Sequence, residues 1–189
     1  MTAGTTPSQT VGPYFAIGLP WDCGPLAAPR EAPGAITISG TVYDGRGEPV
    51  PDHLLEFWQA DPGGRFADMH GYGGASGLEG FRGFARYGVE DGDGTFEVVT
   101  VKPGPVPAPM PGGGLQAPHI DVSVFARGML HRCVTRIYFA DEAEANAACP
   151  VLASVPEARR ATLLAEPTDD GYVFDIRLQG ERETVFFAV

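Results

Sequence analysis

The chain has 189 residues, of which 43% are hydrophobic and 20% are charged, as is usual for a globular protein with a substantial core. Its net charge of −11 excludes nucleic-acid binding through a basic surface, although one well-placed arginine can still attract a small anion. The 26 Gly and 18 Pro residues indicate many turns and short strands rather than long helices.

The three cysteines, Cys23, Cys133 and Cys149, lack the paired spacing of a zinc site or a disulfide framework. The opening residues, MTAGTTPSQT, have neither the basic nor the apolar region of a signal peptide. No apolar run approaches the ~18–20 residues that are needed to span a bilayer. We therefore expect a protein of the cytoplasm.

Residues 1–34 are rich in proline and glycine and carry three aromatic residues without a periodic pattern: Tyr14, Phe15 and Trp21. Such a segment does not build a core of its own, so its aromatic side chains must pack on something else. Two possibilities remain open at this point. The segment is an arm that packs on its own domain, or an arm that packs on a partner chain.

Residues 35–189 predict one all-β domain, an antiparallel β-sandwich, because apolar and alternating segments recur between turns. The predicted strands cover residues 36–42, 53–59, 95–101, 119–126, 132–139 and 172–178. The glycine-rich residues 61–88 predict a long loop. Short helices are expected within residues 142–165, where Pro150 ends one and Pro156 precedes the next.

The pair His119 and Asp121 is the feature of the sequence that most resembles a metal site. Residues two apart on a strand share a face, so the imidazole and the carboxylate can meet at one ion. A ferrous-iron triad needs a second histidine, and His131 is the only one that follows the pair. The alternative is that His119 and Asp121 form hydrogen bonds with each other or with a neighbouring chain.

Arg127 comes directly after the predicted strand 119–126 and before Gly128. A guanidinium at the end of a strand can face a pocket, and its planar donor pattern suits a carboxylate. The simpler interpretation is a solvated surface charge.

Four segments resemble, in order and spacing, the successive blocks of the intradiol ring-cleaving dioxygenases: GTVYDGRGEPVPDHLLEFWQADPGGRF, DGTFEVVTVKPG, APHIDVSVFARG and TRIYFADE. The flanking segments TPSQTVGPYF, ANAACPVL and FDIRLQGERETVFF are similar to the non-iron (alpha) chain of the two-chain members. The resemblance covers nearly the whole chain. It implies a β-sandwich that assembles with a homologous, iron-binding beta chain.

In that family, ferric iron, Fe(3+), is held by two tyrosinates and two histidines. The resemblance matches Phe66 and Val106 to the tyrosine positions, His119 to one histidine and Asp121 to the other. Gln116 stands where the family has an arginine. Phenylalanine and valine have no donor atom, so this chain is expected to hold no metal and the beta chain to hold the iron.

The resemblance also implies a substrate pocket at the interface between the two chains. It assigns substrate-binding positions to Thr10, Gly12, Pro13, Tyr14 and Arg127, with Arg127 facing a carboxylate on the catechol. Residues 1–34 are accordingly expected to be an arm that packs on the partner chain. Two other functions remain as alternatives: a non-enzymatic β-sandwich binding module, and a ferrous-iron oxygenase that uses His119 and Asp121.

Overall fold

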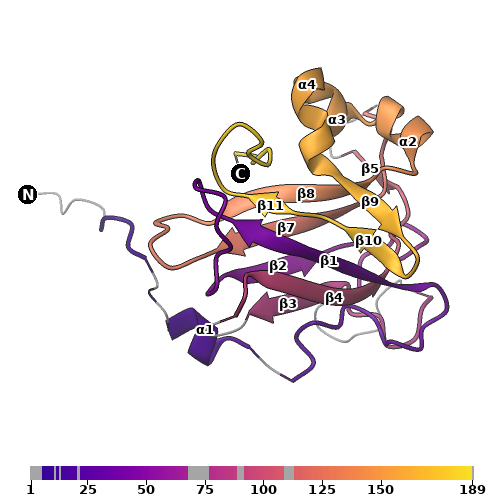
Figure 1. Ribbon diagram of the computed structural model, residues 1–189. Helices are drawn as coiled ribbons and strands as arrows, with labels where there is room; N and C mark the ends of the chain where they lie inside the picture. Colours follow the sequence, from indigo (N-terminus) through magenta and orange to yellow (C-terminus); the bar gives the residue numbers. More distant parts are fainter. Residues whose placement is uncertain are drawn as a thin grey trace, which may run out of the picture.

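The computed structural model describes residues 6–10, 12, 14–20, 22–67, 77–88, 92–108 and 113–188. Nine strands form one hydrogen-bonded sheet that folds over on itself, so that two layers of strands pack face to face (Figure 1). The predicted β-sandwich is confirmed. Within these ranges, every helix falls short of the length and apolar character that crossing a bilayer demands.

The first layer is built around β1 (Ala35–Tyr43), which pairs along its whole length with the antiparallel β4 (Thr95–Val101). The other side of β1 pairs in parallel with β10 (Gly171–Val173) and β11 (Ile176–Arg177). Beyond β10 lies the antiparallel β9 (Leu164–Thr168).

The second layer is antiparallel, in the order β3 (Phe84–Gly88), β2 (Leu54–Trp58), β7 (His119–Phe125) and β8 (Cys133–Phe139). Because β9 also pairs with β8, it joins the two layers at one edge. His119 and Asp121, the pair that the sequence singled out on a strand, lie on β7 of this layer.

Short elements complete the chain. They are α1 (Tyr14–Gly18), the small hairpin of β5 (Val106–Pro107) and β6 (Leu115–Gln116), α2 (Ala143–Ala148), α3 (Pro150–Ser154), α4 (Glu157–Arg160) and a 3-10 turn at Ala161–Leu163. The short helices predicted within residues 142–165 are therefore confirmed, and Figure 1 shows them grouped at one end of the sandwich. Their apolar side chains pack against Tyr138 of β8.

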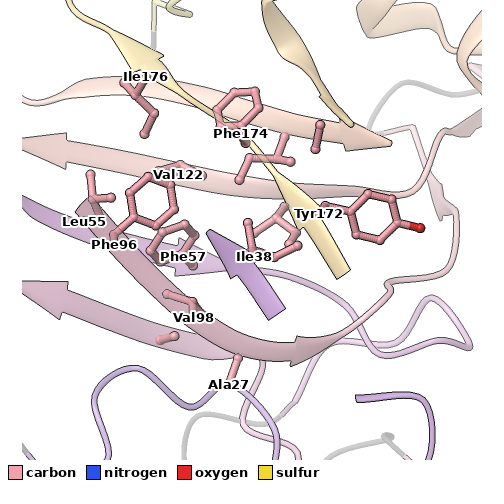
Figure 2. Packing of buried hydrophobic residues seen from close by; sticks show 14 of the residues in the cluster. Ala27, Ile38, Leu55, Phe57, Phe96, Val98, Val122, Tyr172, Phe174 and Ile176 are labelled. Carbon is pink, nitrogen blue, oxygen red and sulfur yellow. The ribbon is translucent and has the colours of Figure 1, made fainter. Parts of the chain in front are cut away.

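The core between the layers follows from the alternation of the strands. On β7, for example, Ile120, Val122 and Val124 are buried, while the residues between them remain partly exposed on the opposite face. Figure 2 shows the rings of Phe57 and Phe96 packed between the two layers. The outer face of the second layer is left for polar and aromatic side chains.

The expected long loop at residues 61–88 is wrong at its end, because Phe84–Gly88 forms β3. This strand pairs with β2 and buries Ala85 in the core. Its inward-facing side chain is small, and a single alanine between Phe84 and Arg86 gives little sign of alternation. Cross-strand pairing with β2 therefore stabilises a strand that its own sequence hardly predicts.

The last predicted strand, residues 172–178, is interrupted between β10 and β11 although both keep the same register on β1. The Asp175 side chain takes the place of a backbone acceptor there, because its Oδ1 accepts a hydrogen bond from the N–H of Thr41 at 3.1 Å. A Cβ atom at Gly40 would lie 1.9 Å from the carbonyl oxygen of Phe174. Only glycine allows the chain to approach β1 so closely.

The predicted arm divides into two parts. Leu26 forms a bridge with Val99 of β4, and the neighbouring Ala27 and Ala28 are buried against the chain's own sandwich. Further toward the N-terminus, the Tyr14 and Ile17 side chains of α1 are exposed. The part of the arm with solvent-facing apolar side chains is therefore the part around α1.

Candidate functional site

Arg127 lies just beyond the end of β7 and forms an ion pair with Asp52, whose Oδ2 is 3.0 Å from the guanidinium Nε. The Arg127 side chain is 60% exposed, whereas that of Asp52 is only 13% exposed. A shielded carboxylate thus holds the arginine at its Nε atom while most of the side chain remains open to solvent.

The register of the second layer brings these two residues together. Leu54 and Phe125 are the last paired positions of the β2–β7 ladder. Asp52 precedes Leu54 by two residues, and Arg127 follows Phe125 by two residues, so the antiparallel ladder, if continued, places them directly opposite each other.

Thr10 joins the arm to the same corner. Its Oγ1 atom accepts a hydrogen bond from the backbone N–H of Gly128 at 3.0 Å and another from the N–H of Gly12 at 3.4 Å. The preceding residue, Gln9, lines a recess of about 130 Å³ together with the residues around Met129. The structure therefore brings Thr10, Gly12 and the Arg127 turn together.

Tyr14 lies further along the arm, at the start of α1, and its side chain is 72% exposed. The end of this helix is attached to the sandwich, because Arg86 of β3 donates a hydrogen bond to the carbonyl of Leu19 at 3.0 Å. No contact between Tyr14 and Arg127 is present in this single chain as far as the structure describes it. Pro13 lies outside the described residues.

The positions that the resemblance matches to iron ligands gather on the outer face of the second layer. Phe66 stacks on Trp58 of β2, with ring centroids 5.8 Å apart and planes inclined by only 7°. Trp58 is in turn the cross-strand neighbour of Asp121 on β7. His119, two residues before Asp121, is buried, and its Nδ1 is 2.7 Å from the carbonyl oxygen of Ala117.

Arg136 of β8 occupies the centre of this region. Its Nε lies 2.8 Å from Oδ1 of Asp121, which is its partner in the β7–β8 register. Its Nη1 donates a hydrogen bond to Oε1 of Gln116 at 2.7 Å and lies 3.5 Å from the Tyr138 hydroxyl. Val106, which is buried, pairs with Gln116 across the β5–β6 hairpin. A permanent cation therefore lies among the positions matched to ligands.

The electrostatics of the region oppose a second positive charge. Burial lowers the pKa of His119, and the positive charge of Arg136 lowers it further, although the hydrogen bond with the Ala117 carbonyl partly offsets these effects. Burial raises the pKa of Tyr138, so its hydroxyl remains a neutral phenol. The histidine is thus neutral and the tyrosine does not supply an anionic oxygen.

These side chains do not fit an iron centre. Ferric iron favours anionic oxygen ligands, but Phe66 and Val106 offer no donor atom and the Asp121 carboxylate is paired with Arg136. Across the described ranges of the chain, no three His, Cys, Asp or Glu side chains come together in a way that would hold a metal ion. The ferrous-iron alternative at His119 and Asp121 lacks a third ligand there as well, since His131 is exposed at the other end of the hairpin.

Beside Asp121, the same face is hollowed into an open recess of about 360 Å³. It is lined by Glu56, Trp58, Phe84, Asp121, Ser123 and Arg132. The recess thus lies on the outer face of β2, β3 and β7, and the core-facing residues of these strands take no part in it.

The charged partners of Arg127 and Asp121, namely Asp52 and Arg136, were not predicted from the sequence. A signal for Arg136 was present, because the predicted strands 119–126 and 132–139 are joined by a short connection, and antiparallel pairing across it places Asp121 opposite Arg136. No comparable signal existed for Asp52, because β2 and β7 are far apart in the sequence and their register is not set by a turn.

Comparison with known proteins adds evidence over the full length of the chain. The chain is 47% identical to the protocatechuate 3,4-dioxygenase alpha chain of Burkholderia cepacia, with 100% of this chain and 99% of that protein covered. It is 32% identical to the beta chain of the same organism's enzyme, with 79% of this chain and 66% of that protein covered. The similarity is thus stronger and more complete to the alpha chain.

The dioxygenase domain of a carbohydrate-binding fusion protein from Streptomyces sp. SirexAA-E has a similar fold, with a TM-score of 0.59 and 29% identity. The alignment covers 93% of this chain and 99% of that domain. A family described as Dioxygenase matches residues 10–180. Together with the relatives above, this match shows that the chain belongs to the intradiol ring-cleaving dioxygenase family.

Proposed function

We propose that this chain is the alpha chain of a protocatechuate 3,4-dioxygenase and works with a homologous beta chain that holds ferric iron. The complex opens the aromatic ring of protocatechuate between its two hydroxyl groups with O2, giving 3-carboxy-cis,cis-muconate. The observation that carries this proposal is the full-length similarity to an alpha chain at 47% identity.

The assignment of the iron to the beta chain is supported by the arrangement around Arg136. Its guanidinium is 2.8 Å from the Asp121 carboxylate, at a position where the family has a histidine ligand. A metal cation at this place would meet the positive charge of Arg136 and the donor-free side chains of Phe66 and Val106. This chain therefore leaves the metal chemistry to its partner.

The contribution of this chain lies at the corner formed by the arm and the Arg127 turn. Protocatechuate carries a carboxylate, and the guanidinium of Arg127 has the geometry and charge to bind it. Thr10 and Gly12 lie beside this turn, and Tyr14 follows on an exposed helix. With Pro13, these residues would face the beta chain's site and complete the substrate pocket.

The partner would cover the exposed side chains of α1, so that residues 1–34 serve in part as an arm on the beta chain. We place the complex in the cytoplasm, in keeping with three cysteines that are all free.

The first test compares the chain purified alone with the chain co-expressed with a homologous beta chain that has all four ligands. Metal analysis and oxygen uptake on protocatechuate are measured on both samples. We expect iron and activity only where the beta chain is present. Near-stoichiometric iron in the chain alone would contradict the proposal and favour a metal site of its own.

The second test replaces Arg127 by alanine in the complex. Loss of a hydrogen bond to a charged group costs about 1.5–3 kcal/mol, so KM for protocatechuate should rise about ten-fold or more. Iron content should not change, because Arg127 is proposed to bind the substrate and not the metal. Arg30→Ala, which removes an exposed and loose ion pair with Glu97, is the matched control.

A further inference from the structure

The contact between Asp52 and Arg127 uses one specific atom of the guanidinium. Asp52 reaches Nε at 3.0 Å, and no other partner of Arg127 is found in the part of the chain that the structure describes. The two terminal nitrogens, Nη1 and Nη2, therefore remain available. They are the pair of donors that can bind both oxygens of a carboxylate side by side.

Asp52 is well suited to fix the direction of this side chain. Its backbone follows Pro51, whose carbonyl accepts a hydrogen bond from the N–H of Gly92 at 3.0 Å. The next residue, His53, is buried, with Nδ1 2.8 Å from the Val50 carbonyl oxygen. Proline and a buried neighbour leave the aspartate backbone little freedom, so its carboxylate is a fixed point.

The carboxylate is also shielded from solvent. The Oδ2 atom of Asp52 is buried and finds no conventional hydrogen-bond donor within the described residues, so the Arg127 charge is what compensates it. A buried, charged oxygen with a single cationic partner holds that partner strongly, because separating them leaves the charge uncompensated. Arg127, by contrast, is mostly exposed and would otherwise sample many rotamers.

We propose that Asp52 is a positioning residue for substrate binding: it holds Arg127 by Nε so that Nη1 and Nη2 face the carboxylate of the substrate in the pocket. This inference rests on the proposed function, in which Arg127 binds that carboxylate. Asp52 does not touch the substrate. It restricts the rotamers of Arg127 before the substrate binds, and so lowers the entropy cost of ordering this side chain on binding.

The test uses the complete alpha–beta complex and two substrates, protocatechuate and catechol, which is the same diol without the carboxylate. For Asp52→Asn, we expect KM for protocatechuate to rise about three- to five-fold, the size expected when a part-exposed ion pair is lost. The kcat for protocatechuate and both constants for catechol should stay within two-fold of the wild type. Glu97→Gln, which breaks the exposed Arg30–Glu97 pair, is the control and should change neither substrate's KM.

Two further variants separate orientation from structure. Asp52→Glu keeps the charge but moves it by one methylene, so KM should lie between wild type and Asp52→Asn. In an Arg127→Ala background, Asp52→Asn should produce no additional rise in KM, because there is no guanidinium left to orient. An equal rise with catechol, or an additional rise without Arg127, would show a merely structural role and overturn the proposal.

The substrate-binding role of Arg127 and the positioning role of Asp52 are tested separately. If Arg127→Ala leaves KM for protocatechuate unchanged, the substrate-binding role of Arg127 in the proposed function is wrong. If Arg127→Ala raises KM but Asp52→Asn and Asp52→Glu do not, only the role of Asp52 is wrong. Melting temperature and co-elution of the two chains, measured for each variant, identify any loss of folding or assembly.

Discussion

Asp121 on β7 lies directly opposite Arg136 on β8, and its Oδ1 atom is 2.8 Å from the guanidinium Nε. The resemblance matches this aspartate to a metal-binding histidine of the family. Its charge now pairs with a side chain of the same chain. The guanidinium of Arg136 therefore neutralises the charge of Asp121 at a place that the resemblance matches to a metal centre.

The first prediction concerns the strength of this pair. In a double-mutant cycle with Asp121→Asn and Arg136→Met, we expect a coupling of about 1 kcal/mol in the free energy of unfolding, at the upper end for an ion pair with partial exposure. Chemical denaturation of the four purified proteins measures it. The same cycle on Arg30 and Glu97, whose side chains are 59% and 57% exposed and 3.8 Å apart, should give a coupling near zero. Equal couplings in both cycles would contradict this prediction.

The second prediction concerns pH and the buried His53. Burial lowers the pKa of His53 below its usual value of 6.5, and the hydrogen bond with the Val50 carbonyl only partly offsets this. Below pH 6.5 the unfolded chain takes up this proton more readily than the folded chain, so the folded state loses stability as the pH falls.

We expect His53→Gln to reduce the free energy of unfolding at neutral pH. Between about pH 6.5 and pH 5, this free energy should decrease less steeply in the variant than in the wild type. Some fall should remain, because the pKa of His119 is lowered in the same direction. Urea denaturation at several pH values measures the slope. His131→Gln, at an exposed histidine, is the control for replacing a histidine by glutamine, and an unchanged slope for His53→Gln would disprove the assignment.

The third prediction concerns Gly40. Gly40→Ala places a Cβ atom 1.9 Å from the Phe174 carbonyl oxygen, which is part of the backbone and moves only if β10 and β11 shift away from β1. We expect a loss of about 3 kcal/mol or more in the free energy of unfolding, a large effect for one methyl group. Gly47→Ala is the comparison, because Gly47 has φ of 81° but open space around it, so only backbone strain of about 1 kcal/mol is expected. A smaller loss for Gly40→Ala than for Gly47→Ala would contradict the close approach.

The fourth prediction concerns the exposed face of α1. Ile17 is 62% exposed in this chain, and burial of such a side chain in an interface contributes about 1.5–3 kcal/mol. Ile17→Asp should therefore weaken association with the beta chain about ten-fold or more, while the melting temperature of the isolated chain changes little. Sedimentation of mixed chains measures the affinity. Val173→Asp, at a 40% exposed position on β10, is the control for a charge introduced elsewhere, and an equal loss there would argue against α1 as the contact.

Much of the fold was predictable because most strands of the sandwich alternate, as in β7, where buried Ile120, Val122 and Val124 follow one another at every second position. β3 was missed because Ala85 contributes too little hydrophobic contrast for the strand to be recognised. α1 was missed because its five residues carry no periodic signal of their own. For β3, pairing with β2, which is distant in the sequence, stabilises the strand.

In the candidate site, too, features with a local sequence signal were predicted and features that depend on distant contacts were not. Arg127 was predicted as a candidate because a guanidinium at the end of a strand can face a pocket and bind a carboxylate. Its partner Asp52 was not predicted, since the contact depends on the register between β2 and β7. About sixty residues separate these strands, so the sequence does not show how they are aligned. Asp121 and Arg136 lie on consecutive strands joined by a short connection, so their pairing is easier to predict from the sequence.

The part of the arm around α1 is attached to the sandwich on both sides of this helix, through Thr10 on Gly128 and through Leu19 on Arg86. A free tail would have to lose its conformational freedom on assembly, at about 1–2 kcal/mol for each backbone residue that becomes ordered. Because the two attachments exist within one chain, much of that loss is already incurred when the chain folds. We therefore expect the speed of assembly with a partner to be limited by the encounter of two folded surfaces, and not by the slow search of a disordered segment for its binding groove.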